Sequence, residues 1–317
     1  VQLNGGNDGL NTVIPLDQYA NLTKARPNII IPENKIIPLK DHENLGLHPA
    51  LGPLNNLYNE GRVTLVQNVG YPNQDFSHFR STDIWLSGSA ANETVGTGWL
   101  GRYLDNINPG FPEGYPNATN PDPLAIQVGA VVSPALNGPD GNTGIAINDP
   151  DSFYQLVTDT DPTNKETPMG HELAFLRQTA LQTNAYAQRI KTAAGLANTL
   201  STKYPVGNTL ADQLKIVARL IAGGLQTKVY MVNLTGFDTH AAQVDSTDTT
   251  TGDHASLLKD LADAIFAFQD DLGLLGVNER VLGMTFSEFG RRIKSNGSNG
   301  TDHGAAAPLF LFGQEFL

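Results

Sequence analysis

Three short apolar runs in the last quarter of the chain constrain its fold most. They cover residues 229–234, 281–286 and 309–312, and all three are rich in β-branched or aromatic side chains. Runs of this length and composition are typical of buried strands, so they predict strands of a parallel sheet. Segment 253–275 has helical periodicity and connects the first two runs, which predicts a right-handed strand–helix–strand unit.

Acidic and histidine residues stand beside the ends of these three runs. Asp238 and His240 follow the first run, Glu288 follows the second, and Asp302 and His303 precede the third. Loops at the carboxyl ends of strands are where open α/β sheets build their sites. All five side chains are of types that bind metal ions. We therefore expect a site here rather than a set of unrelated surface loops.

The rest of the chain alternates helical and strand patterns, which is typical of an α/β protein. Residues 17–48 are rich in Pro and Asn and are expected to be irregular, and residues 107–170 predict a loop-rich insertion or lid. Further helices are expected at 48–61, 96–106, 171–201 and 208–224 and, after a loop, within segment 68–88. Further strands are expected at 62–67 and 124–128.

Composition excludes several classes of protein. The 317 residues carry a net charge of -12, which argues against binding to a nucleic-acid backbone or to an anionic membrane. There is no cysteine, so disulfides and thiolate catalysis are ruled out. No apolar run approaches the ~20 residues of a membrane span, and no signal peptide is visible. Both ends look cut, and we expect further sequence beyond each. Nothing in the pattern predicts an oligomeric state.

Asp8 lies in a glycine-rich turn near the start of the chain. Gly5, Gly6 and Gly9 allow tight or left-handed backbone around it. Asn-Asp-Gly is also ordinary turn chemistry. Asp8 on its own therefore does not predict a site. It becomes a candidate ligand only if it lies close to the acidic and histidine residues of the C-terminal cluster.

Segment 68–88 runs from a strand end through a loop into a helix, and Ser77 and His78 lie near the start of that helix. Ser77 is either a nucleophile or a helix N-cap, and the N-cap is the commoner role of serine at this position. His78 is either a site residue or a surface group.

The cluster predicts one or two divalent ions. Two imidazoles and one carboxylate, from His240, His303 and Asp238, suit Zn, Mn or Fe. Asp8 and Glu288 supply oxygen ligands for Mg, Mn, Ca or a second Zn. Two neighbouring ions can clamp the oxygens of a transferred phosphoryl or sulfuryl group.

Arg291 and Arg292 follow Glu288 within what would be one helical turn. Either guanidinium could bind a tetrahedral anion through two hydrogen bonds. A solvated helix face is the alternative interpretation, for at least one of them.

Six motifs together resemble an exported bacterial family described as "domain of unknown function 1501". They are NGGNDGLNTVIPL, SHFRSTDIWLSG, GWLGRYL, GFDTHAAQ, TFSEFGRR and GTDHGAAAPLFLFG. That family is similar to the alkaline phosphatase superfamily, which includes sulfatases. The resemblance implies a three-layer α/β/α fold, with a mainly parallel, alkaline phosphatase-like sheet, and a metal site at the strand edge. It also implies a leader, often of twin-arginine type, and hence a periplasmic or secreted location.

The resemblance also implies roles for single residues. Asp8 looks like the superfamily's acidic ligand after the first strand, and Asp238 and His240 look like its Asp–His pair. Glu288 looks like the Asp of a second Asp–His pair, with Phe289 where the histidine would be. His303 looks like the later lone histidine that precedes a proline and a strand. For the nucleophile, Ser77 is the nearest candidate and Thr82 a distant second.

We therefore expect a single alkaline phosphatase-like domain over residues 1–317, truncated at both ends. Its expected function is that of an exported, metal-dependent hydrolase of phosphate or sulfate esters, acting on a small anionic ester with Zn, Mn, Mg or Ca. The alternative is a catalytically inactive relative that binds a ligand or a protein. The expected metal ligands are Asp8, Asp238, His240, Glu288 and His303, and the expected catalytic residues are Ser77, His78 and Arg291. The five ligands should converge at one sheet edge, with residues 107–170 over or beside them.

Overall fold

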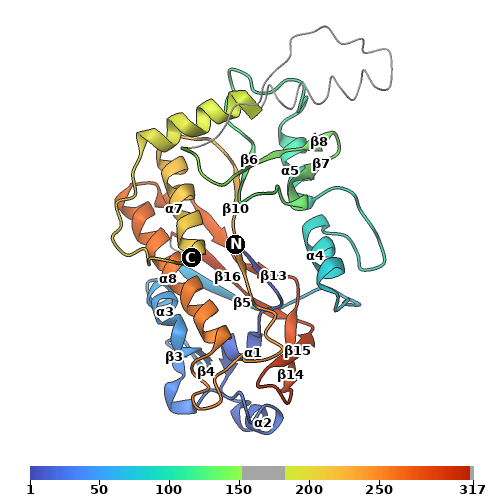
Figure 1. Cartoon of the computed structure of the whole chain (residues 1–317), viewed down its shortest axis with the longest axis vertical. Helices are drawn as coiled ribbons and strands as arrows, with labels where there is room; N and C mark the ends of the chain where they lie inside the picture. The colour runs from blue at the N-terminus through green and yellow to red at the C-terminus, as the bar shows by residue number, and fades with distance from the viewer. Residues whose placement is uncertain (152–182, 315–317) are drawn as a thin grey trace. The chain divides into compact units, whose positions relative to one another are not determined.

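A computed structural model gives the architecture of the chain and describes residues 1–151 and 183–314 (Figure 1). The chain divides into two compact units, which are described separately. Unit 1 comprises Val1–Thr94, Leu200–Leu214 and Val232–Leu317, and unit 2 comprises Val95–Thr199 and Lys215–Met231. The protein is of mixed α/β type, as the alternating sequence pattern predicts.

The sheet that carries the site in unit 1 has the strand order β11–β1–β13. These strands are β11 (Asn233–Thr235), β1 (Gln2–Asn4) and β13 (Phe286–Ser287). Both pairings are parallel, so the carboxyl ends of all three strands lie at one edge. Residues 5–8, 236–240 and 288 follow those ends directly, which brings three distant parts of the chain together.

The second sheet of unit 1 is antiparallel, so the prediction that all three C-terminal runs form parallel strands is wrong in part. It has the order β12–β16–β5, with β12 (Leu282–Met284), β16 (Ala307–Gly313) and β5 (Val63–Val69). Both pairings are antiparallel. The prediction for 309–312 was right about the strand and its burial but wrong about its direction. The apolar content of a segment indicates that its strand is buried, but a buried strand can be either parallel or antiparallel to its neighbours.

Residues 17–48 are more regular than expected. They contain α2 (Tyr19–Ala25), β3 (Ile37–Leu39) and β4 (His42–Leu47), and β4 pairs antiparallel with β3 and with β2 (Val13–Pro15). The apolar residues that hold this part together are few and scattered along the sequence: Ile14, Leu22, Ile31 and Ile36. Their wide spacing explains why the pattern looked irregular.

Two helices pack together in unit 1, α3 (Gly52–Asn59) and α8 (Asp253–Leu274) (Figure 1). Apolar side chains recur in α8 at three- and four-residue steps, and all of these are buried: Leu258, Leu261, Ile265, Phe268 and Leu272. That periodicity buries one stripe of a helix against a core. The remaining helices of unit 1 are α1 (Gly9–Thr12), α4 (His78–Ser87) and the short 3-10 helices Glu33–Lys35, Pro49–Leu51 and Asn278–Arg280.

A two-stranded hairpin completes the site region, formed by β14 (Gly290–Ser295) and β15 (Thr301–Gly304). The strands are antiparallel, and Arg291 lies opposite His303. The expected helical turn after Glu288 is therefore wrong. Because side chains alternate along a strand, Arg291 is buried while its neighbour Arg292 is exposed.

Unit 2 has a parallel sheet in the order β10–β6–β9, with β10 (Val229–Met231), β6 (Ala125–Val128) and β9 (Gly144–Ile147). Its other elements are α5 (Trp99–Ile107), the helical residues 183–196, the 3-10 helix Pro134–Leu136, and the strands β7 (Asn137–Gly138) and β8 (Gly141–Asn142). Helix α7 (Thr209–Ala222) runs from the residues of unit 1 into those of unit 2. Much of the expected helix 171–201 lies outside the described residues. None of the helices in the described ranges is both long and apolar enough to cross a membrane.

Candidate metal centre

Two glycines let the loop after β1 approach the site. Gly5 and Gly6 have φ values of 122° and 82°, which L side chains rarely adopt. A Cβ on Gly5 would lie 2.2 Å from the backbone nitrogen of Asp238, and one on Gly6 would lie 2.4 Å from the Phe289 ring. The loop can therefore pack here only because both residues lack a side chain.

Asp238 is the carboxylate at the centre of the cluster. Its Oδ1 accepts a hydrogen bond from Nη2 of Arg291 at 2.6 Å and lies 3.2 Å from Nε2 of both His240 and His303. Its Oδ2 lies 3.4 Å from Nε2 of His78. Partial burial raises the pKa of Asp238, but hydrogen bonding, above all from Arg291, outweighs it and lowers the pKa to about 2. Asp238 is therefore an anion at any ordinary pH.

The outer nitrogen of each of the three imidazoles meets an oxygen acceptor. Nδ1 of His78 lies 2.9 Å from Oε1 of Glu288, Nδ1 of His240 lies 3.3 Å from Oδ1 of Asp302, and Nδ1 of His303 lies 2.7 Å from the carbonyl of Phe76. A carboxylate or carbonyl can only accept, so each Nδ1 is suited to carry a proton and donate it to its acceptor. In that tautomer each Nε2 has a lone pair, and each Nε2 faces Asp238.

The inward nitrogens of His240 and His303 lie within hydrogen-bond distance of each other. Nε2 of His240 lies 2.9 Å from Nε2 of His303, so one ring can donate to the other. In the tautomer with both outer nitrogens protonated, the two inward lone pairs face each other beside a carboxylate. A metal ion would engage all of these donors at once.

The donor set fits a small transition-metal ion. The ligand atoms of His78, Asp238 and His303 all lie within 4.8 Å of one another. Nε2 of His240 lies 3.2 Å from Oδ1 of Asp238 and 2.9 Å from Nε2 of His303. Ligands at the usual bond lengths of about 2.0–2.2 Å around tetrahedral zinc lie about 3.3–3.6 Å apart. The 3.2 Å and 3.4 Å separations from Asp238 to the rings are close to that value, and the separation of the His240 and His303 nitrogens is shorter than it. A carboxylate or carbonyl on the outer nitrogen of each ring is also what metal-bound histidines have.

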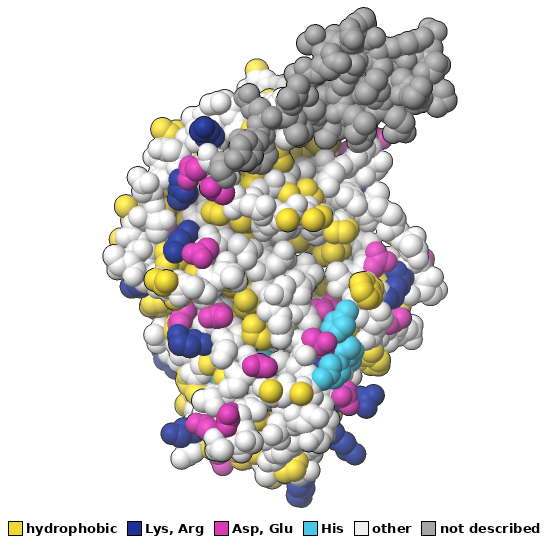
Figure 2. Space-filling view, in the orientation of Figure 1, with side chains coloured by type: hydrophobic (Ala, Val, Ile, Leu, Met, Phe, Trp, Pro, Cys, Tyr) yellow, Lys and Arg dark blue, Asp and Glu magenta, His cyan; other side chains and the backbone are white. Residues whose placement is uncertain are grey.

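The centre is open to solvent on one side. The side chains of Asp238 and His240 are 47% and 43% exposed, and that of His78 is 34% exposed. Figure 2 shows histidine side chains gathered in one surface patch, with acidic side chains beside them. The buried ring of Phe289 packs against two of the imidazoles, with its centroid 4.9 Å from that of His78 and 4.5 Å from that of His303. The centre therefore has both a solvent-exposed side and a contact with the core.

Helix α4 brings His78 to the cluster. The Trp85 ring stacks on the Phe286 ring of β13, with centroids 5.7 Å apart, which fixes the helix against the sheet. Tyr71 and Ser81 share a hydrogen bond of 2.7 Å that ties the preceding loop to the helix. The sequence pointed to His78 as a catalytic candidate, and the structure places it among the inward-facing donors.

Arg291 holds loops together and is not free to bind an anion. Its side chain is fully buried, and besides Asp238 it donates to the backbone carbonyls of Gly5, Gly6, Phe237 and Thr301. The guanidinium thus joins three loops of the site. Arg292 points the other way, is 66% exposed, and lies 3.9 Å from Oδ2 of Asp302.

Glu288 lies behind His78 and has no free oxygen. Its side chain is 3% exposed. Its Oε1 accepts from the backbone nitrogen of Gly5 at 2.8 Å and from His78, and its Oε2 accepts from Oγ of Ser287 at 3.2 Å. This arrangement suits a carboxylate that orients an imidazole rather than one that binds an ion itself.

Asp8 is buried in a different set of contacts. Its Oδ2 accepts from Nη1 of Arg26 at 2.8 Å and from Nε2 of Gln243 at 2.6 Å, and its Oδ1 caps α1 through the nitrogen of Leu10. Burial raises the pKa of Asp8, but the Arg26 charge, with further help from neighbouring groups, lowers it below its ordinary value overall. Of the five expected ligands, the structure thus brings three together, puts Glu288 one contact behind them, and pairs Asp8 with Arg26.

Ser77 stands at the N-cap position of α4, but its side chain makes no capping hydrogen bond. The side chain is exposed, and its backbone nitrogen donates to Oδ1 of Asp75. We expect Ser77→Ala to change the free energy of unfolding by less than about 0.5 kcal/mol and to leave metal content and any hydrolysis intact. Urea denaturation, metal analysis and turnover measure these three quantities. Loss of turnover in a folded, fully metallated variant would instead identify Ser77 as a nucleophile.

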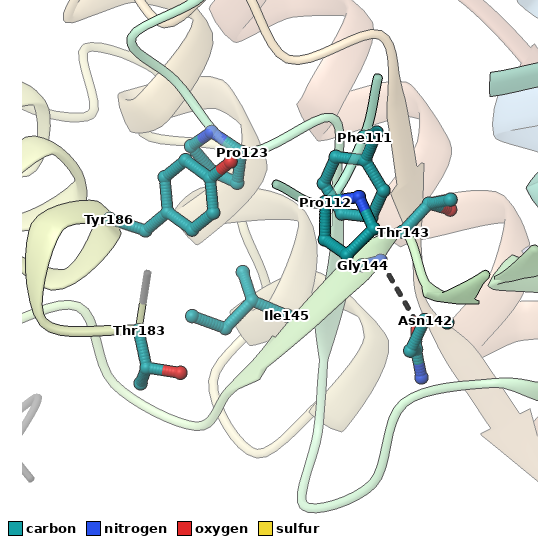
Figure 3. Close-up of a pocket in the computed structure, with 10 residues that line it drawn as sticks. Phe111, Pro112, Pro123, Asn142, Thr143, Gly144, Ile145, Thr183 and Tyr186 are labelled. Atoms are coloured by element: carbon teal, nitrogen blue, oxygen red, sulfur yellow. Dashed lines mark hydrogen bonds between the residues drawn. The ribbon is translucent and has the colours of Figure 1, made fainter. Parts of the chain in front are cut away.

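The expected position of residues 107–170 over the cluster stays a prediction. Residues 107–151 belong to unit 2, and residues 152–170 lie outside the described residues. Unit 2 has a small cavity of about 110 Å³ that Figure 3 shows between Phe111, Pro123, Ile145 and Tyr186. Among its described lining residues only Tyr186 is titratable, and burial raises the pKa of Tyr186 to about 12. This cavity of unit 2 therefore offers no cluster of titratable side chains among its described lining residues.

The comparisons with known proteins give a family but no described activity. Residues 48–314 match the family described as "Protein of unknown function (DUF1501)". The match covers well over half of the chain, so the protein belongs to this family. It includes the residues of the metal centre, whereas β1 and Asp8 precede it. No curated protein and no solved structure matches the chain.

Proposed function

We propose that His78, Asp238, His240 and His303 hold one divalent transition-metal ion. The observation that carries this proposal is the shared orientation of the three rings: each outer nitrogen lies beside an oxygen acceptor, and each inner nitrogen faces the Asp238 carboxylate. Three imidazoles favour zinc, or manganese or iron, over the oxygen-seeking magnesium and calcium. One ion is favoured over two, because Asp8 and Glu288 are engaged in other contacts.

We propose further that the protein is a metal-dependent hydrolase of small phosphate or sulfate esters. A divalent ion of this kind acts as a Lewis acid and lowers the pKa of water that it binds. Three neutral imidazoles and one carboxylate contribute a single negative charge, so a divalent ion leaves the centre with a net positive charge. An anionic ester is therefore attracted to this centre even though the whole chain carries a charge of -12.

The protein's own groups divide the remaining tasks. Arg291 and Phe289 fix the positions of Asp238 and the rings, and Glu288 and Asp302 keep two of the imidazoles in the tautomer that presents Nε2. Arg292 is an exposed cation beside Asp302. The family resemblance adds two expectations to this proposal: a three-layer, alkaline phosphatase-like arrangement and export from the cell.

Metal analysis followed by activity assays tests the proposal. Protein purified without chelator is expected to contain about one zinc, manganese or iron per chain. It is expected to hydrolyse at least one member of a panel of aryl phosphate and aryl sulfate esters. Dialysis against a chelator should abolish this turnover, and adding the metal back should restore it. Protein that takes up none of these ions would contradict the metal centre. Full metallation without hydrolysis across the panel would favour the alternative, a binding module that uses the centre to hold a ligand or a partner.

A further inference from the structure

One buried amide connects the two loops that carry most of the centre. Oε1 of Gln243 accepts from Oγ1 of Thr301 at 2.6 Å and from Oγ1 of Thr239 at 3.3 Å. Nε2 of Gln243 donates to Oδ2 of Asp8 at 2.6 Å. The side chain is fully buried, as are both hydroxyls to within 3% exposure.

The two threonines are neighbours of the proposed ligands. Thr239 stands between Asp238 and His240, and Thr301 stands two residues before His303. Thr301 also donates its backbone nitrogen to the carbonyl of Thr239 at 3.2 Å, so the loops touch at this point. The distance between the two Nε2 atoms therefore depends on how closely these threonines are held.

Asp8 extends the same chain of contacts to the hairpin. It is joined to Arg26, whose Nη2 and Nε donate to the carbonyls of Arg292 and Ile293 at 2.7 Å and 2.8 Å. Both carbonyls belong to β14, which pairs with the strand of His303. The Gln243 amide thus contacts both ligand loops and the ion pair that supports β14.

We propose that Gln243 is a positioning residue that sets the separation of His240 and His303 and so tunes the affinity of the centre for metal. This inference rests on the proposed metal centre and extends it. An amide suits the position because it accepts and donates at once without carrying a charge. A carboxylate would repel Asp8, and an aliphatic side chain would leave two hydroxyls and one carboxylate oxygen without this partner.

The experiment compares two buried glutamines. Gln243→Leu removes the contacts to Thr239, Thr301 and Asp8. Gln269→Leu removes a similarly buried amide of α8, whose Oε1 accepts from Arg62 rather than from a residue of the centre. Gln243→Leu is expected to weaken zinc binding about 10- to 100-fold, the usual effect of losing a supporting partner. Gln269→Leu is expected to lower the melting temperature but to leave zinc affinity unchanged, which separates positioning from general stability. A visible spectrum of the Co²⁺-loaded protein should change in the first variant only.

Thr301→Val is the second variant, and it tests the same contact on its own if Gln243→Leu does not fold. It removes one donor to Oε1 while keeping the shape of the side chain, so zinc affinity should fall. Where Gln243→Leu folds, the double variant should bind zinc no more weakly than Gln243→Leu alone, because the two changes break one contact. Zinc affinity equal to that of the unchanged protein in both single variants would overturn the positioning role while leaving the metal centre intact.

A measurement without metal distinguishes the two proposals. In chelator-treated protein, hydrogen exchange at residues 301–303 should lose protection in Gln243→Leu and keep it in Gln269→Leu. If the unchanged protein binds no zinc but this difference appears, the proposed function fails and the positioning role stands. Equal protection in both variants would count against the positioning role.

Discussion

Alanine at His303 is expected to lower the affinity for zinc by more than ~100-fold, because loss of a mere supporting partner already costs 10- to 100-fold. The ring supplies one of the inward nitrogens, 2.9 Å from that of His240 and 3.2 Å from Oδ1 of Asp238. Water replaces an imidazole ligand poorly. Competition titration with a chromophoric chelator measures the affinity.

His42→Ala is the matched control for this experiment. His42 is an exposed histidine of β4, away from the ligand loops, and its loss should not change metal content. Ser77→Ala, next to His78 in the chain, should also retain the ion. Unchanged zinc affinity in His303→Ala would contradict the whole assignment of the centre, including the role of His78.

Arg26→Met is expected to destabilise the protein by about 3–5 kcal/mol, because it leaves the buried charge of Asp8 without its partner. Neither side chain of this ion pair is exposed, and Arg26 also holds two carbonyls of β14. Lys259→Met breaks an exposed ion pair with Asp263 and should cost less than about 1 kcal/mol. Urea denaturation at neutral pH measures both losses.

The effect of Arg26→Met should depend on pH in a defined direction. The folded pKa of Asp8 is lowered below the ordinary value of 3.8, so the ion pair contributes its full stability above about that pH. The contribution is lost as the pH falls further, through the folded pKa of Asp8. The difference between the unchanged protein and the variant should therefore shrink in acid. A difference that is equally large at neutral and strongly acidic pH would show that the loss comes from packing rather than from charge.

Helices were the part of the fold most open to prediction. Residues 253–275 and 208–224 repeat apolar side chains over many turns, and the observed α8 and α7 end within two residues of the predicted limits. The direction of β16 relative to its neighbouring strands could not be predicted from the sequence. Its pairing with β5 is set by contacts between residues more than 200 positions apart, which a local pattern does not record.

The site shows the same division. Asp238, His240 and His303 could be found because rare residue types stood beside strand ends. The roles of Arg291 and Asp8 could not be predicted, because these roles depend on the direction in which each side chain points from the backbone. Arg291 lies on a strand instead of a helix, so its side chain turns inward to the carbonyls, and Asp8 meets Arg26, whose position no motif marks. Only the folded chain shows that His78 joins the cluster through α4.

The central place of β1 in its sheet has a consequence for synthesis. The neighbours of residues 2–4 in the sheet, 233–235 and 286–287, are made more than 200 residues later than β1 itself. At ribosomal rates of 5–20 residues per second, this strand waits roughly 10 to 50 s for its first partner. Until then it has two unpaired edges, and the Gly5 loop lacks the Asp238 and Phe289 contacts against which it packs. The ligand pocket can therefore close only after residues 286–287 have left the ribosome, and the proposed metal ion would be captured after that point.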